Sequence, residues 1–209
     1  MKIGIIGSGR IGGTAARLFT RSGHEVAIAN SRGPDSLADL VDELGENARA
    51  ATVEDAADFG DVVLEAIPFR RYGELPADHL AGKIVIDADN YYPARDGHID
   101  ELDSDRTTST ELIARHLEGA RMVKAFNTIN AGELASDGRL DAPREERVAL
   151  FVAGDDEDAK RVVSRLIEDI GYAPVDSGSL AEGGRRQQAG SPMYGKVLKA
   201  PEAEAAIGR

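Results

Sequence analysis

Cysteine and tryptophan are absent from the 209-residue sequence, and histidine occurs only four times. Without cysteine the chain can form no disulfide, no thiolate metal site and no cysteine nucleophile. No two histidines stand at the spacing of a metal-binding pair, so we expect no metal site. Long apolar runs are also missing, and we therefore expect no membrane partner.

Positive charge is scarce as well, because 25 Lys and Arg residues face 37 Asp and Glu residues and leave a formal net charge of -12. A surface of this sign repels phosphate backbones, so we expect no nucleic-acid partner. The first strand-like residues begin at the N-terminus, which leaves no room for a signal peptide, and we expect a cytoplasmic protein. The length fits one sizeable domain, alone or with a short appendage.

Short apolar segments alternate along the chain with segments whose apolar residues recur at helical spacing. The pattern predicts strands at residues 1–6, 25–29, 61–67, 83–87, 121–126, 147–153 and 172–175, and helices at residues 10–22, 34–44, 108–117 and 155–170. Near-continuous apolar strands between helices are typical of a parallel sheet covered on both faces. The sequence therefore predicts an α/β fold with a Rossmann-type, doubly wound, mainly parallel sheet.

We assign this fold to a single domain, residues 1–176, followed by a C-terminal loop and tail, residues 177–209. Residues 177–195 are rich in Gly, Ser, Arg and Gln, a composition typical of loops. We expect the C-terminal segment to cover the active-site face or to form a dimer contact, and the protein to be a homodimer.

Three glycines, Gly7, Gly9 and Gly12, lie where the first predicted strand gives way to the first helix. Gly7 permits a tight turn, Gly9 lets the backbone approach a pyrophosphate, and Gly12 lets helix and strand pack closely. The helix N-terminus would offer free N–H groups and a positive dipole to the phosphates. A purely structural turn is the weaker interpretation, because glycine here lowers helix stability unless the space is needed.

The second predicted strand ends in the sequence ANSRGP, and this ending indicates which dinucleotide binds. Sites for NAD carry an acid there to hold the ribose 2′-hydroxyl, whereas this chain has Asn30 followed by Ser31 and Arg32. A carboxylate would repel a 2′-phosphate, while a hydroxyl and a guanidinium would bind it. We therefore predict NADP(H). The alternative is a turn that only caps the next helix, which Ser31 could do but which explains Arg32 poorly.

The ends of the later strands are the expected lining of the nicotinamide side. Pro68 is either a strand terminator or a rigid apolar edge against the cofactor. Asn127 either donates a hydrogen bond to a carboxamide or substrate oxygen, or caps a turn. The sequence shows no acid–base motif, and hydride transfer between two cofactors needs mainly positioning, whereas reduction of a carbonyl also needs a proton donor.

Five segments together resemble the NADPH-dependent coenzyme F-420 reductase family, the F-420:NADP oxidoreductases. They are IGIIGSGRIGGTAARLF, NSRGPDSL, VKAFNTI, LFVAGDDEDAK and DSGSLAEGGRRQ, and the resemblance covers nearly the whole chain. The chain is also similar to the nucleotide domains of the six-transmembrane ferric reductases. One segment, GRRQQAGSPMYG, departs from the family pattern around the deazaflavin, which leaves the acceptor open.

The resemblance implies a set of cofactor contacts beyond those argued from the residues themselves. It places Ser8, Arg10 and Ile11 with the three glycines at the phosphates, Ser31 and Arg32 at the 2′-phosphate, and Ile67, Pro68, Ala125 and Asn127 at the nicotinamide. A flavin-like partner would then enter between the loop after Phe126 and the loop from Gly178 to Tyr194.

We therefore predict an NADP(H)-dependent oxidoreductase that transfers a hydride between nicotinamide and a flavin-like, small-molecule acceptor. Coenzyme F-420 is the first candidate acceptor, and a flavin is the next. Three alternatives stay open: a reductase of small imines or carbonyls, a reductase of flavins or ferric chelates, and an NADPH-binding protein without catalysis.

Overall fold

The computed structural model describes residues 1–208, and within them eight β-strands form one sheet in the order β3-β2-β1-β4-β5-β6-β7-β8. The strands are β1 (Lys2–Ile6), β2 (Glu25–Ala29), β3 (Ala48–Ala50), β4 (Val62–Glu65), β5 (Ile84–Asp87), β6 (Arg121–Lys124), β7 (Ala149–Ala153) and β8 (Ala173–Gly178). Strands β1 to β6 are parallel, and β7 pairs antiparallel with β6 and parallel with β8. The predicted α/β fold with a mainly parallel sheet is confirmed.

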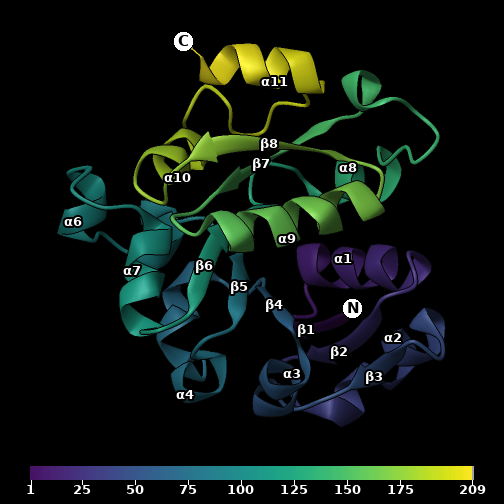
Figure 1. Cartoon of the computed structure of the whole chain (residues 1–209). Helices are drawn as coiled ribbons and strands as arrows, with labels where there is room; N and C mark the ends of the chain where they lie inside the picture. The colour runs from purple at the N-terminus through teal and green to yellow at the C-terminus, as the bar shows by residue number, and fades with distance from the viewer. Residues whose placement is uncertain (209) are drawn as a thin grey trace.

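Helices cover both faces of this sheet (Figure 1). They are α1 (Arg10–Arg21), α2 (Ala38–Leu44), α3 (Val53–Phe59), α4 (Ala77–Leu80), α5 (Pro93–Asp96), α6 (Asp100–Asp103), α7 (Ser109–His116), α8 (Ala131–Ser136), α9 (Glu157–Asp169), α10 (Glu182–Gln187) and α11 (Ala200–Ile207). Short 3-10 helices occupy Pro34–Leu37, Phe69–Glu74 and Arg144–Glu146. None of the helices in residues 1–208 is long and apolar enough to cross a membrane.

The two faces of the sheet bury separate cores because successive side chains of a strand point to opposite sides. On one face, Ile3 and Ile5 of β1 pack in one cluster with Phe19 of α1 and Val163 of α9. On the other face, Ile6 belongs to a second cluster that also holds side chains of α3, α4 and α7. Burial of the strands on both sides explains why their sequences are almost continuously apolar.

The order of the strands places a ligand site at the carboxyl end of β1. From β1 the chain first extends the sheet through β2 and β3 on one side, and then returns to add β4 on the other. Loops leaving neighbouring strands in opposite directions open a crevice at such a switch point, which is where doubly wound sheets bind their ligands. The loops after β1, β2, β4, β5 and β6 all meet this edge.

The prediction of a loop at residues 177–195 is wrong. Strand β8 continues to Gly178, and helix α10 follows at Glu182–Gln187. Gly183 is buried in this helix, and a Cβ placed on it would lie 2.7 Å from the Cβ of Ala153 in β7. Gly183 therefore lets helix α10 approach the sheet closely. Composition alone does not distinguish a glycine in this role from a glycine in a loop.

Two further segments differ in detail from the prediction. Residues 34–44 begin as the 3-10 turn Pro34–Leu37 and continue as α2. The C-terminal tail contains α11, whose Ala200 and Ala203 pack in a cluster with Phe151 of β7 and Val175 of β8. The tail thus covers the last two strands of the sheet.

Candidate functional site

The turn after β1 has a backbone that only glycine fits at two positions. Gly7 has a φ of +112°, and a Cβ on it would lie 2.4 Å from the carbonyl oxygen of Ala66. A Cβ on Gly12 would lie 1.9 Å from the carbonyl oxygen of Gly7. Both distances are far below van der Waals contact, so these glycines hold β1, β4 and α1 close together.

The middle glycine differs from its neighbours because its surroundings are open. A Cβ on Gly9 would meet no atom within 4 Å, so the backbone here faces unfilled space. No side chain caps the N-terminus of α1, and the first turn of this helix has no acidic residue. The N–H groups and the positive end of the helix are therefore available to an anion, which fits a dinucleotide pyrophosphate.

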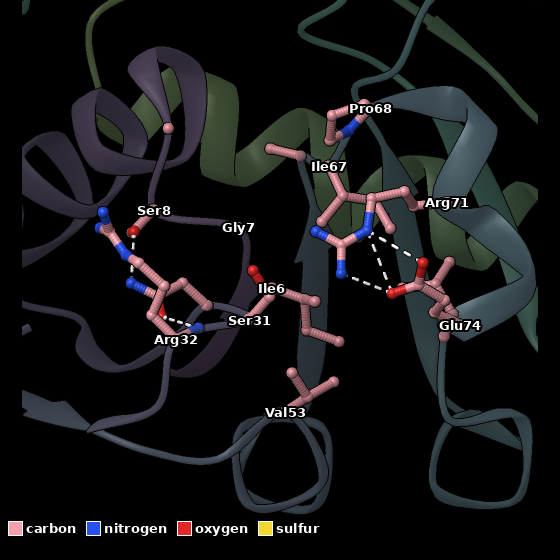
Figure 2. A pocket seen from close by; sticks show the side chains of 14 residues that line it. Ile6, Gly7, Ser8, Ser31, Arg32, Val53, Ile67, Pro68, Arg71 and Glu74 are labelled. Carbon is pink, nitrogen blue, oxygen red and sulfur yellow. Dashed lines mark hydrogen bonds and ion pairs between the residues drawn. The ribbon is translucent and has the colours of Figure 1, made fainter. Parts of the chain in front are cut away.

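A first cavity of about 390 Å³ opens on the β2 side of this turn (Figure 2). One wall comes from the glycine turn and the end of β2, and the other from the segment after β4. Its lining includes Ile6, Gly7, Ser8, Gly9, Asn30, Ser31, Arg32, Val53, Ala66, Ile67, Pro68, Arg71, Glu74 and Leu75. The structure thus brings together the predicted phosphate turn and the predicted 2′-phosphate residues.

Asn30 connects the two halves of this wall through its side chain. Its Nδ2 donates hydrogen bonds of 3.0 Å to the hydroxyl oxygens of Ser8 and Ser36, and its Oδ1 accepts one of 2.8 Å from the backbone N–H of Arg32. An aspartate could accept the bond from Arg32 but could not donate to the two serines. Asn30 therefore braces the turn that carries Ser31 and Arg32.

The charge on Arg32 is not neutralised by a neighbouring residue. Its side chain is exposed and forms no ion pair with a carboxylate of residues 1–208. Arg71, on the facing wall, differs in this respect because its Nε lies 3.0 Å from both carboxylate oxygens of Glu74. The hydrogen bond from Arg71 lowers the pKa of Glu74. Arg32 is therefore the better placed of the two cations for binding a phosphate.

Arg71, Glu74 and Val53 are cavity residues that sequence reasoning missed. They follow Pro68 or open α3, where the sequence shows no motif. The structure also places Ile67 and Pro68 in this first cavity with Arg32, on the side expected for the adenosine half, and not beside Asn127.

A second cavity of about 440 Å³ lies on the other side of the glycine turn, at the ends of β5 and β6. It is lined by Arg10, Ile11, Ala88, Asn90, Tyr92, Phe126, Asn127, Ile129, Asn130, Ala131 and Tyr194. No His, Asp, Glu or Lys of the described chain is among these residues. Ala125, predicted at the nicotinamide, is fully buried in the core and lines neither cavity.

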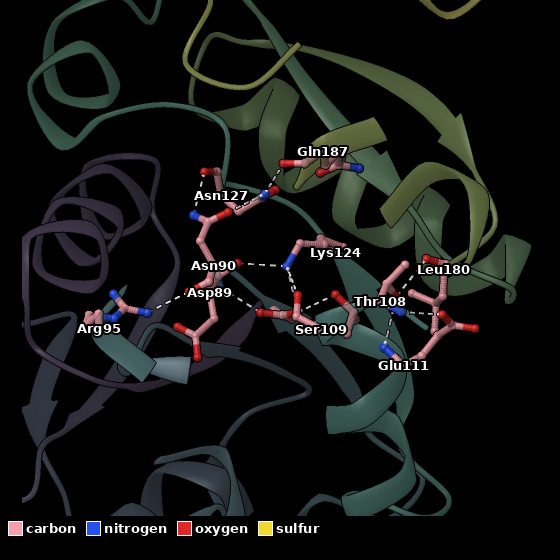
Figure 3. Close-up of polar contacts among 12 residues, drawn as sticks. Asp89, Asn90, Arg95, Thr108, Ser109, Glu111, Lys124, Asn127, Leu180 and Gln187 are labelled. Atoms are coloured by element: carbon pink, nitrogen blue, oxygen red, sulfur yellow. Dashed lines mark hydrogen bonds and ion pairs between the residues drawn. The ribbon is translucent and has the colours of Figure 1, made fainter. Parts of the chain in front are cut away.

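Phe126 and Asn127 reach this cavity through an unusual backbone turn. Phe126 has a φ of +67°, a conformation that bulky residues rarely adopt, and its ring packs edge-on against Phe19. The Nδ2 of Asn127 donates to Asn90 Oδ1 at 3.1 Å and to the carbonyl oxygen of Gln187 at 2.8 Å (Figure 3). The predicted donor of Asn127 is thus engaged within the protein, where it joins the segment after β5 to α10.

A buried group of charged side chains lies beneath the second cavity. Lys124 Nζ is 2.9 Å from Asp87 Oδ2 and 2.8 Å from the carbonyl oxygen of Asp89 (Figure 3). Although burial alone would raise the pKa of Asp87, the charge of Lys124 and hydrogen bonds lower it. The ion pair links the ends of β5 and β6, next to Ala88 and Asn90, and the side chain of Lys124 is almost completely buried.

Two further carboxyl groups in this buried group have raised pKa values. Glu65 is fully buried, and burial followed by the charges of Asp89 and Asp87 raises its pKa. Burial and the charge of Asp87 raise the pKa of Asp89 in the same way. Oxygens of Glu65, Asp87 and Asp89 lie within 4.8 Å of one another, a spacing that would also suit a cation. The ammonium group of Lys124, paired with Asp87, already offsets part of this negative charge.

Together, the doubly wound sheet, the glycine turn and the unpaired arginine define a dinucleotide-binding oxidoreductase fold. A family model described as "NADP oxidoreductase coenzyme F420-dependent" matches residues 2–91. A crystal structure of a hypothetical protein, SMa0349 from Sinorhizobium meliloti, is 38% identical, with a TM-score of 0.81 over 95% of both chains. The chain belongs to this family of NADP oxidoreductases, as its sequence resemblance predicts.

Two relatives carry more specific names. A candidate F420-dependent NADP-reductase from Arthrobacter sp. FB24 is 28% identical, with a TM-score of 0.73 over 88% of both chains. The metalloreductase STEAP3 of Rattus norvegicus is 32% identical over 182 residues, which are 86% of this chain and 34% of the metalloreductase. The chain therefore spans about a third of the length of that metalloreductase.

Proposed function

We propose that this chain transfers a hydride between NADP(H) and a flavin-like ring acceptor, with coenzyme F420 as the first candidate. The observation that carries the proposal is the pairing of two cavities across one glycine turn. The first holds the residues suited to a 2′-phosphate, and the second has aromatic, apolar and amide side chains beside the guanidinium of Arg10. When bound, the nicotinamide supplies the hydride chemistry itself.

The residues of the chain act in this proposal by binding and by orientation. Gly7, Gly9 and Gly12 shape the turn for the pyrophosphate, and Ser31 and Arg32 select the cofactor with a 2′-phosphate. The second cavity offers no carboxylate, imidazole or amine among its lining residues. Such a cavity suits a reaction in which positioning two rings is the main requirement.

Anaerobic stopped-flow measurement of NADPH oxidation tests this function directly. We expect rapid oxidation with F420 and slower oxidation with FMN or FAD, and no oxidation without an acceptor. Ferric chelates belong in the same panel because the chain is related to a protein named as a metalloreductase. Reduction of a ferric chelate only when a flavin is added would identify the flavin as an intermediate carrier.

Two results would contradict the proposal. Turnover of small imines or carbonyls without any ring acceptor would favour the alternative reductase. Tight NADPH binding with no turnover across the panel would favour a binding protein without catalysis. The predicted homodimer, with the C-terminal segment as its contact, remains a proposal that light scattering on the purified chain would test.

A further inference from the structure

Two tyrosines from distant parts of the chain meet at the second cavity. Tyr92 follows β5, and Tyr194 belongs to the C-terminal segment after α10. Both line the cavity, both are half-buried, and their hydroxyl groups are hydrogen-bonded to each other. Their ring centroids are 6.5 Å apart, with an angle of 72° between the ring planes.

The surroundings hold both rings in place. The guanidinium of Arg95 lies over the ring of Tyr92, 4.8 Å from its centroid, and Arg95 also donates a 2.6 Å hydrogen bond to the carbonyl oxygen of Asn90. The backbone N–H of Tyr194 donates to Ser191 Oγ at 3.2 Å, and the N–H of Gly195 donates to the carbonyl oxygen of Thr128 at 3.1 Å. The pair is therefore a fixed part of the cavity wall.

A count of hydrogens shows that this pair has one donor to spare. Two phenol groups carry two O–H hydrogens, and their mutual bond uses one of them. In the described part of the chain, neither hydroxyl of Tyr92 and Tyr194 has another partner. Burial, followed by the hydrogen bond with Tyr92, raises the pKa of Tyr194 above the ordinary value for tyrosine, so its hydroxyl stays protonated at neutral pH.

We propose that the Tyr92–Tyr194 pair forms the binding site for the edge of the acceptor ring, donating its spare O–H to a carbonyl oxygen or ring nitrogen. This inference rests on the proposed function and narrows it. Such a site selects planar heteroaromatic hydride acceptors that have an oxygen or nitrogen atom on the ring edge able to accept a hydrogen bond. Flavins and deazaflavins share this chemistry.

Either hydroxyl can supply the donor, which makes a set of phenylalanine variants informative. In Tyr92→Phe the remaining hydroxyl of Tyr194 is released from the mutual bond and can donate, and the same holds in reverse for Tyr194→Phe. Only the double variant removes every donor. We expect each single variant to keep acceptor kcat/KM within about threefold of the wild type, and the double variant to lose about tenfold, the value of one hydrogen bond.

The experiment combines turnover with two binding measurements. Acceptor KM and kcat are measured with F420 and with FMN, NADPH affinity by fluorescence titration, and FMN affinity by quenching of flavin fluorescence with and without NADP+. We expect the loss in the double variant to fall mainly on acceptor KM and FMN affinity, with NADPH affinity unchanged. Tyr72→Phe is the matched control, since Tyr72 lines a different cavity with His116.

Three outcomes would overturn the inference. The double variant could match the wild type, which would show that the hydroxyls contact no acceptor. Each single variant could lose acceptor and NADPH binding together, which would show that the pair only ties the C-terminal segment to the fold. The wild type could also fail to bind FMN or F420 at all. If these ligands bind without being reduced, the proposed function fails, and the binding data still decide the role of the pair.

Discussion

Replacement of Arg32 by alanine tests the cofactor assignment most directly. The guanidinium is exposed at the first cavity and has no carboxylate partner in residues 1–208. Removing it costs the fold little, because surface substitutions away from buried contacts change stability only slightly. The expected loss is therefore confined to the interaction with a 2′-phosphate.

The size of that loss follows from the exposure of the site. A hydrogen bond to a charged group contributes about 1.5–3 kcal/mol, and solvent screening places an exposed arginine near the lower end. We expect Arg32→Ala to weaken NADPH binding by roughly 10- to 30-fold and to leave NADH binding within about twofold. The difference between the losses of affinity for NADPH and for NADH should become smaller as the salt concentration rises.

Calorimetric titration of the wild type, Arg32→Ala and Arg71→Ala with NADPH and NADH measures these effects. Arg71 is the matched control because it lines the same cavity but is already paired with Glu74. We expect Arg71→Ala to show no comparable preference between the two cofactors. Equal losses for NADPH and NADH in Arg32→Ala would refute the assignment of Arg32 to the 2′-phosphate.

Three further predictions concern the fold around the site. Gly9→Ala should keep its melting temperature but weaken NADPH binding, whereas Gly12→Ala should lower the melting temperature because its Cβ would collide with Gly7. Gly183→Ala should lower stability by roughly 1–3 kcal/mol in urea unfolding through overpacking against Ala153. Glu65 has a raised pKa in the folded state. Above about pH 4.5 the unfolded chain therefore loses a proton that the folded chain binds more tightly. The free energy of unfolding should fall as the pH rises through this range, by up to about 1.4 kcal/mol per pH unit. Glu65→Gln should flatten this fall above about pH 4.5, and parallel stability profiles for variant and wild type would contradict it.

The fold was largely predictable because its signals are local. Near-continuous apolar strands predict a sheet buried on both faces, and the helix predicted at residues 108–117 forms as α7, with a capping box made by Thr108 and Glu111. The glycine turn was predictable for the same reason, since its spacing and its place after a strand carry the information. Helix α10 was not, because its Gly183 serves a close contact with Ala153 of β7 that only the folded chain reveals.

The second cavity was less predictable than the first because distant segments build it. Tyr92 and Tyr194 are 102 residues apart, and no local pattern relates them. Ala125 was expected at the nicotinamide, but the positive φ of Phe126 turns the chain there and brings Phe126 and Asn127 to the cavity instead. A backbone conformation of this kind is set by tertiary packing, and a phenylalanine gives no sign of it in a sequence.

Asn30 has two properties that bear on the proposed cofactor site, and only one of them is visible in the sequence. Its lack of charge indicated a cofactor with a 2′-phosphate, and that inference needs only the identity of the side chain. Its donor hydrogens add a second role, because they hold the hydroxyls of Ser8 and Ser36 while its oxygen holds the backbone of Arg32. The turn proposed for the pyrophosphate and the turn proposed for the extra phosphate are thus joined through one amide. Cofactor choice and phosphate binding are for this reason coupled properties of the site, and a substitution at Asn30 would act on both.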